Sequence, residues 1–337
     1  MLWQNILQRT CTYKKSGECN IAHNIIIPKD FKARYSKILG KENKVFLNYC
    51  IKPLRKSIRI NTIKYPDPEH LAKQLEEQYG WNLKQIPWFK DAYWIQNPDV
   101  KEGIVGNTFE HFMGYYYVQE ASSLIPPVVL DPKPTENILD MAAAPGSKTT
   151  QICQMMHNKG SIVANDINIE RIKALRFNIE KLGCLNIATI RSNGITLSKT
   201  NLTFDKILLD APCSSEGTVR KNWKVLSRWS TSYIKQMSKE QKKLILSAYD
   251  MLKPGGVLVY STCTLAPEEN EEVIDHLLKH REDAKVMPVK VKGLKIRPGI
   301  EEWEGKTYNA EVKKIARIWP QDNDSEGFVV AKIMKST

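Results

Sequence analysis

Two cysteines stand where a buried strand would end and a loop would begin. Cys213 lies in LLDAPCSSEGTV (208–219) and Cys263 in VYSTCTLAPEEN (259–270), each after an apolar run. A thiol at the rim of a sheet becomes a nucleophile when its surroundings lower its pKa from about 8.5. The other thiols lack such a setting and are expected to be inert; they are Cys11, Cys19, Cys50, Cys153 and Cys184.

A metal centre is not indicated. The seven cysteines are scattered without a C-x-x-C pair, so the sequence predicts neither a zinc site nor a disulfide framework. His276 and His280 stand one helical turn apart, but no third ligand accompanies them, and we expect them on a solvated helix face.

A loop rich in small residues indicates a second kind of chemistry. LDMAAAPGSKTTQI (139–152) connects a predicted strand to a predicted helix, so its backbone can approach a ligand beside the helix N-terminus. A phosphate-binding P-loop is excluded, because Met141 replaces its first glycine and Lys148 follows Ser147 instead of glycine. Asp166, after the next predicted strand, is placed to take both ribose hydroxyls of a nucleoside. A dinucleotide and S-adenosylmethionine both fit, and a solvent-facing Asp166 is the alternative.

The net charge of +13 favours a polyanionic partner such as nucleic acid. A thiol, a nucleoside cofactor and a nucleic acid together suggest methylation of cytosine at carbon 5. Attack of a thiolate on carbon 6 gives carbon 5 the nucleophilic character that it otherwise lacks. Asp210, three residues before Cys213, is placed to hold the N3 edge of the ring. A second thiol would help to release the product.

The elements that must position these residues alternate regularly from about residue 135. Ile169, Ile172, Leu175, Ile179 and Leu182 recur at helical spacing before Gly183, which is expected to end that helix. Further helices are expected over 238–256 and 266–282. The predicted strands are NILDMA, SIVANDI, IATIRS, DKILLDA and GGVLVYST, and this order is typical of a doubly wound, mostly parallel α/β sheet. Ligands bind such sheets at the carboxyl ends of the strands, where all the motifs above lie.

Over residues 55–334 the chain resembles the Fmu/Sun family of RNA cytosine-5 methyltransferases, most closely its archaeal tRNA-directed members. The motifs that carry the resemblance are IRINTIK (58–64), YYVQEASS (116–123), DMAAAPGSKTTQ (140–151), ANDIN (164–168), DAPCSSEGTVRKN (210–222), YSTCTLAPEENE (260–271) and ARIWPQDNDSEGF (316–328). The resemblance implies a class I S-adenosylmethionine-dependent methyltransferase domain.

By the same resemblance, Cys263 is the nucleophile, Cys213 assists product release, Asp210 holds the cytosine and Lys148 lines the reaction centre. DNA cytosine methyltransferases place their nucleophile at the position of Cys213, but the Ser-Thr-Cys setting of Cys263 favours the RNA family. Asn193 replaces an aspartate common in the family, so we expect weaker cofactor binding. The residues implied to contact or frame the cofactor are Ala142, Ala143, Ala144, Pro145, Gly146, Ser147, Lys148, Asp166, Arg171, Asn193 and Asp210.

The expected domain organisation is an N-terminal extension of unknown role (1–30), a smaller α+β RNA-binding domain (31–125) and the catalytic domain (126–337). The basic run 52–64 and Tyr115–Tyr117 are candidate RNA contacts, and Arg220, Lys221 and Lys224 are expected at backbone phosphates. We expect a cytoplasmic monomer without metal or membrane contact. tRNA is favoured as substrate and rRNA stays open; a catalytically weak RNA-binding or ribosome-assembly factor and a DNA methyltransferase are the rival interpretations.

Overall fold

The computed structural model of the protein describes residues 12–13, 19–20, 27–97, 100 and 103–337. Two short strands, β1 (Thr12–Tyr13) and β2 (Cys19–Asn20), pair antiparallel. Most of the proposed extension 1–30, including Cys11, lies outside the described residues, as does the side chain of Cys19. Among the described residues, no helix is both long and apolar enough to cross a membrane.

The larger of the two main sheets carries the motifs found in the sequence. Its strands follow the order β12-β16-β11-β10-β7-β8-β9, and β15 also pairs with β16. The five strands from β9 to β11 are parallel, whereas β16 is antiparallel to its neighbours. The strands are β7 (Asn137–Asp140), β8 (Ser161–Asn165), β9 (Ile187–Ile190), β10 (Phe204–Asp210), β11 (Leu252–Thr262), β12 (Ala284–Met287), β15 (Ala316–Ile318) and β16 (Phe328–Lys335).

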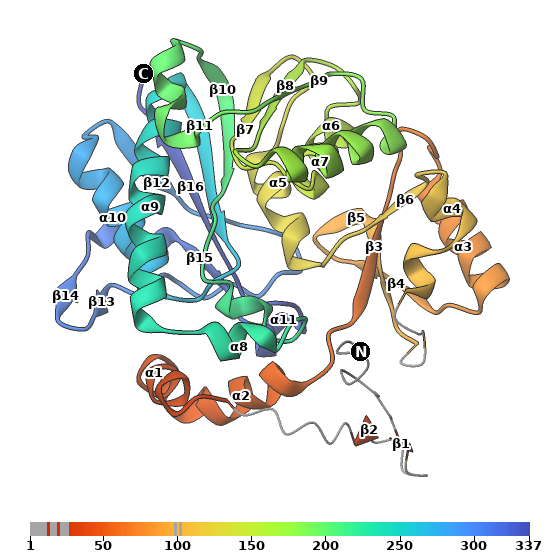
Figure 1. Ribbon diagram of the computed structural model, residues 1–337, viewed down its shortest axis with the longest axis horizontal. Coiled ribbons are helices and arrows are strands. Elements are labelled where there is room, and N and C mark those ends of the chain that lie inside the picture. The colour runs from red at the N-terminus through yellow and green to blue at the C-terminus, as the bar shows by residue number, and fades with distance from the viewer. Residues whose placement is uncertain (1–11, 14–18, 21–26, 98–99, 101–102) are drawn as a thin grey trace, which may run out of the picture.

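Helices cover both faces of this sheet (Figure 1). Successive residues of β10 point into two different cores. Ile207 and Leu209 belong to one core, and Leu208 belongs to the other. This pattern is the one expected of a strand buried on both sides. α5 (Ile125–Leu130), α6 (Ser147–Met155) and α7 (Ile169–Leu182) pack in the core that holds Leu208, and α9 (Thr231–Asp250) and α10 (Glu271–His280) in the other. The expected doubly wound α/β fold is therefore confirmed.

The predicted helices are present with shifted ends. Gly183 ends α7 in the left-handed conformation, as expected, and Asn168 caps its start. The helix expected over 238–256 starts earlier, at Thr231, where Ser230 caps it, and ends at Asp250 because β11 begins at Leu252. The helix expected over 266–282 divides into a 3-10 turn, Pro267–Glu269, and α10.

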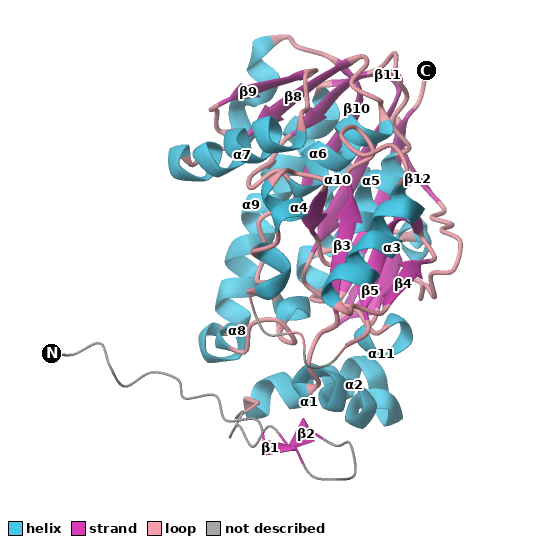
Figure 2. Cartoon of the chain, turned by 90° about the vertical axis from the view of Figure 1, so that its right-hand side faces the viewer, coloured by secondary structure: helices cyan, strands magenta, loops and turns pink. Residues whose placement is uncertain are grey.

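A separate four-stranded antiparallel sheet, in the order β4-β5-β3-β6, lies beside the large one (Figures 1 and 2). Its core includes Ile58, Leu71 and Tyr116. The elements of this smaller unit are β3 (Lys56–Ile60), α3 (Pro68–Tyr79), β4 (Leu83–Ile86), β5 (Phe89–Ile95), α4 (Phe109–Phe112) and β6 (Tyr116–Val118).

A buried arginine connects the smaller sheet to the large one. Arg59 of β3 is fully buried and donates from Nε to Gln119 and from Nη2 to Thr150 of α6, both at 2.8 Å, and it also bonds Gln154. The smaller sheet is therefore fixed to the helix that follows the 139–152 loop.

The first two helices, α1 (Lys29–Leu39) and α2 (Asn43–Ile51), do not pack on the smaller sheet. Phe31, Tyr35 and Phe46 belong to the core of the large sheet, and Tyr35 packs edge-on against Trp319. The remaining short elements are α8 (Lys224–Arg228), β13 (Glu302–Trp303), β14 (Lys306–Thr307) and α11 (Pro320–Asn323).

Candidate active site

The two cysteines of the rim meet because β10 and β11 are parallel neighbours. Asp210, the last residue of β10, is in register with Ser261 near the end of β11, so both cysteine loops leave the sheet at the same edge. The Sγ atoms of Cys213 and Cys263 lie 3.3 Å apart, and both residues are partly exposed. The sequence expectation that these two thiols share one site is consistent with this geometry.

A glycine allows the Cys263 loop to lie this close to its neighbours. The backbone N–H of Gly217 donates to the carbonyl of Cys263 at 2.9 Å. A Cβ at position 217 would lie 2.0 Å from the carbonyl oxygen of Gly327. Any larger residue would therefore separate the two cysteine loops from the 325–328 segment.

The two thiols are electrostatically unequal. A hydrogen bond from Cys213 lowers the pKa of Cys263. The Ser215 hydroxyl, 3.6 Å from Cys263 Sγ, and the Lys148 ammonium also lower this pKa. The same hydrogen bond, with burial, raises the pKa of Cys213 well above its usual value. Cys263 is the thiol that the site favours as a thiolate, with Cys213 as its proton-bearing neighbour.

An ion pair lies beside the thiols. Lys148 Nζ donates to Asp210 Oδ2 at 2.6 Å, and Ser261 Oγ donates to Asp210 Oδ1 at 2.7 Å. Burial lowers the pKa of Lys148, but the Asp210 carboxylate more than offsets it and raises that pKa above its usual value. The Lys148 ammonium also lies 5.6 Å from the centre of the Phe328 ring. The site thus presents an ammonium and a carboxylate, both fixed in orientation, next to the Cys263 thiol.

The 139–152 loop enters α6 through a glycine in the left-handed region. Gly146 has φ +105°, and a Cβ there would lie 2.9 Å from Leu175 Cδ1. No side chain caps the start of α6 at this glycine, so amides of the first turn can bind an anionic group. In this loop Ala143, Ala144 and Lys148 are buried, and Pro145 is exposed.

Asp166 and Arg171 brace this loop. The Ala144 N–H donates to Asp166 Oδ2 at 3.3 Å. The same carboxylate oxygen pairs with Arg171 Nη1 at 3.3 Å, and the Arg171 guanidinium also donates to the Ala144 carbonyl. Asp166 is only 3% exposed. Asn193, after β9, is exposed and accepts from the Ile195 N–H at 3.0 Å. The cofactor roles of these three residues stay predictions.

Sequence reasoning did not assign roles to several residues of this site. Ser261, Ser215 and Phe328 lie within quoted motifs but carried no role of their own. Asp140, at the end of β7, accepts from Thr149 at 2.7 Å, and burial raises its pKa to about 7. Their place in a motif was the signal that could have found these residues. Ser261, Phe328 and Asp140 lie at or next to a strand end, and Ser215 lies in the cysteine loop after β10.

The expected phosphate contact of Arg220 is wrong. Arg220 is 4% exposed and donates to the carbonyls of Lys52, Pro53 and Ser325, and it pairs with Asp324 at 2.8 Å. Lys221 and Lys224 are exposed, whereas Tyr116 is buried in the core of the smaller sheet.

Within the described part of the chain, no group of three or more His, Cys, Asp or Glu residues could hold a metal ion.

The sheet order, the small-residue loop and the uncapped helix start define a class I S-adenosylmethionine-dependent methyltransferase. The particular family follows from comparison with known proteins. The family model of the 16S rRNA methyltransferase RsmB/F matches residues 127–334, and that of the N-terminal domain of RsmF matches residues 27–121. The chain belongs to this family, and the resemblance drawn from its motifs is confirmed.

Curated relatives include both tRNA and rRNA enzymes. A tRNA (cytosine(49)-C(5))-methyltransferase of Pyrococcus abyssi is 50% identical over 310 residues, which are 92% of this chain and 96% of that protein. Ribosomal RNA small subunit methyltransferase F of Shewanella loihica is 43% identical over 296 residues, 86% of this chain but only 58% of that protein.

Two solved structures from Pyrococcus horikoshii share the fold. A methyltransferase homolog protein has a TM-score of 0.81 at 37% identity and covers 92% of this chain and 96% of its own. NSun6, solved with SFG, has a TM-score of 0.78 at 24% identity over 92% of this chain and 98% of its own.

Proposed function

We propose that this protein methylates carbon 5 of cytosine in RNA through a covalent adduct between Cys263 and carbon 6. The observation that carries the proposal is the 3.3 Å contact of two unequal thiols beside the Lys148–Asp210 pair. S-adenosylmethionine, when bound at the 142–148 loop with Asp166, Arg171, Asn193 and Asp210, supplies the methyl group.

In the first step, the Cys263 thiolate forms a bond to carbon 6, and the electron pair of the 5,6 double bond moves onto carbon 5 and is delocalised toward N3. The Lys148 ammonium donates toward the N3 edge, where negative charge develops, and the Asp210 carboxylate holds the ring by accepting from the exocyclic amine. Carbon 5 then accepts the methyl group.

In the second step, carbon 5 loses its proton and the bond between Cys263 and carbon 6 breaks, which restores the double bond. Cys213, which keeps its proton while Cys263 attacks, is proposed to give that proton to the departing Cys263 sulfur across the 3.3 Å contact. The Cys213 thiolate that results takes the proton from carbon 5, so that both sulfurs end the step protonated.

The preferred substrate in this proposal is tRNA. The Pyrococcus abyssi tRNA enzyme aligns over 96% of its length, whereas the Shewanella loihica rRNA enzyme has much sequence beyond the aligned part. We further propose residues 31–125 as the RNA-binding domain, 126–337 as the catalytic domain, and a cytoplasmic monomer as the working form. An rRNA substrate is the second candidate, because the family model is that of rRNA methyltransferases.

The test supplies purified protein and labelled S-adenosylmethionine with either unmodified total tRNA or unmodified rRNA. Nucleoside analysis is expected to show 5-methylcytidine in tRNA. Label in rRNA alone would move the substrate assignment to the second candidate. Cofactor binding without methylation of either RNA would contradict the proposed function.

A further inference from the structure

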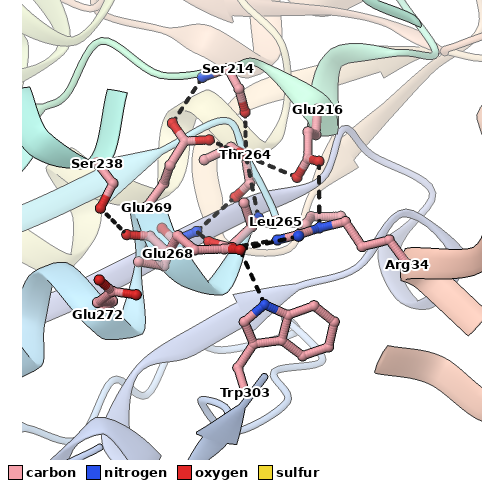
Figure 3. A network of polar contacts seen from close by, with 12 residues as sticks. Arg34, Ser214, Glu216, Ser238, Thr264, Leu265, Glu268, Glu269, Glu272 and Trp303 are labelled. Carbon is pink, nitrogen blue, oxygen red and sulfur yellow. Dashed lines mark hydrogen bonds and ion pairs between the residues drawn. The ribbon is translucent and has the colours of Figure 1, made fainter. Parts of the chain in front are cut away.

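A buried polar cluster includes Ser214 and Thr264, the residues that follow the two cysteines, and the methyl-transfer steps above do not use it (Figure 3). Its centre is Glu269, which is 0% exposed and belongs to the 3-10 turn before α10. Glu269 Oε2 accepts from the N–H of Ser214, the residue after Cys213, at 2.9 Å. Its Oε1 lies 3.3 Å from the hydroxyl of Thr264, the residue after Cys263. One carboxyl group therefore connects both cysteine loops.

The Thr264 hydroxyl has more acceptor neighbours than protons. Its Oγ1 lies 3.3 Å from Glu269 Oε1 and 3.1 Å from Glu216 Oε2, and it also lies 2.9 Å from the Ser214 hydroxyl, which has a proton of its own to donate. A hydroxyl carries one proton, so it can donate to only one of these two carboxyl oxygens. The other carboxyl group must supply a proton of its own for its contact with Thr264 to be a hydrogen bond.

The surroundings decide which carboxyl group carries that proton. Glu216 is surrounded by groups that stabilise a carboxylate. Tyr35 donates to its Oε2 at 2.8 Å, Trp229 donates to its Oε1, and the Arg34 guanidinium lies 4.0 Å away. Among the described residues, no ion pair involves Glu269. Its Oε2 receives the Ser214 N–H and the neutral amide of Gln241, each at 2.9 Å. A buried carboxylate without a cation is costly.

We propose that Glu269 is kept as a neutral carboxylic acid and acts as a positioning residue for the two cysteine loops. It donates from Oε1 to Thr264, Thr264 donates to Glu216, and Oε2 holds the Ser214 loop. The chain of bonds fixes Cys213 against Cys263 without placing a negative charge behind the thiolate. Independently of the proton count, burial raises the pKa of Glu269 to about 7.

Loss of that proton near neutral pH would weaken the cluster. An ionised Glu269 would have no proton for Thr264, would face Glu216 with like charge, and would further disfavour ionisation of Cys213. Three titratable groups face Glu269 from the surrounding elements: Glu216 and Cys213 from the loop after β10, and Tyr260 of β11. The Arg34 guanidinium of α1 lies on the far side of Glu216, and α9 contributes the neutral Gln241.

The first test reads the protonation state directly and needs no RNA. Infrared spectra of the full chain at about pH 5.5 are expected to show the carbonyl stretch of a buried neutral carboxylic acid, lost as the pH rises through about 7. Glu269→Gln should remove the part of this absorption that belongs to Glu269, and the part that remains includes that of Asp140, whose pKa burial also raises to about 7. Glu272→Gln is the matched control, because Glu272 pairs with Lys242 at 2.7 Å and Lys306 at 3.0 Å and should not contribute to it. A spectrum that Glu269→Gln leaves unchanged would overturn the proposal.

The second test rests on the proposed function. Glutamine reproduces the bonds of a neutral Glu269, so Glu269→Gln should keep methyl transfer within about threefold at pH 6, whereas Glu269→Ala should lose about tenfold or more. Above pH 7 the activity ratio of Glu269→Gln to the unaltered protein should rise, and a ratio constant with pH would count against the proposal. If no RNA is methylated, the proposed function fails while the infrared result still decides the state of Glu269.

Discussion

The Sγ atoms of Cys213 and Cys263 lie 3.3 Å apart at the ends of two neighbouring parallel strands. Their shared hydrogen bond lowers the pKa of Cys263 and raises that of Cys213. The site thereby favours a thiolate at Cys263 while Cys213 keeps its proton. Two cysteines 50 residues apart in the sequence thus form one hydrogen-bonded pair with unequal acidity.

This asymmetry predicts the order of thiol modification. Iodoacetamide at neutral pH should alkylate Cys263 before Cys213, because only the thiolate reacts. Cys213→Ala removes the hydrogen bond that lowers the pKa of Cys263, so alkylation of Cys263 should become severalfold slower. Mass spectrometry of timed samples gives both rates, with the buried Cys50, whose pKa burial raises to about 12, as the internal control. Faster labelling of Cys213 would contradict the assignment.

Ser261 is predicted to position Asp210. Ser261→Ala removes the 2.7 Å bond to Asp210 Oδ1 but leaves the Lys148 ion pair. We expect kcat to fall about tenfold, the effect of one lost hydrogen bond to a charged group, with a smaller change in the Kd for S-adenosylmethionine, because the other proposed cofactor contacts are untouched. Calorimetry and methyl-transfer assays separate the two quantities. The exposed Ser227 provides the matched control, since Ser227→Ala should change neither.

The ion pair of α1 with the catalytic core should contribute strongly to stability. Arg34 is buried, bonds both oxygens of Glu268, and lies 5.0 Å from the Trp303 ring centre. Arg34→Ala leaves Glu268 without its cation, so the free energy of unfolding should fall by about 3–5 kcal/mol. Urea denaturation measures this change. Lys41→Ala, on the exposed surface, should stay within about 0.5 kcal/mol, and an equal loss in both variants would refute the assigned role.

Stability should depend on pH through Asp140. Burial raises its pKa from 3.8 to about 7, so the folded state binds more protons than the unfolded state between these values. The contribution of Asp140 is therefore complete below about pH 4 and is lost as the pH rises through about 7. Melting temperatures of Asp140→Asn should fall less over this range than those of the unaltered protein. If calorimetry gives the same change of melting temperature with pH for both proteins, Asp140 is ionised in the folded state.

Local pattern was enough to predict the elements that position the site. The alternation after residue 135, the stop at Gly183 and the two strand-end cysteines are all present in the structure. These features depend on neighbours in sequence, through periodicity and turn chemistry, and so a single chain reveals them.

The contacts that sequence reasoning missed join distant segments. Arg220 follows a cysteine motif and looked like a phosphate ligand, yet it binds carbonyls 105 and more residues away. Arg34 and Glu268 are separated by 234 residues, and Glu269 joins two loops that appear unrelated in the sequence. No periodicity predicts which buried carboxylate meets which donor, because the tertiary packing decides it.

Trapping of the protein–RNA adduct tests the proposed covalent step. Purified protein, Cys213→Ala and Cys263→Ala are incubated with unmodified tRNA and S-adenosylmethionine, and protein–RNA adducts are separated by denaturing electrophoresis. We predict that Cys213→Ala accumulates an adduct linked through Cys263, as peptide mass spectrometry would identify, and that Cys263→Ala forms no adduct and no 5-methylcytidine. An adduct through Cys213 in a Cys263→Ala variant that still methylates would contradict the proposed role of Cys263.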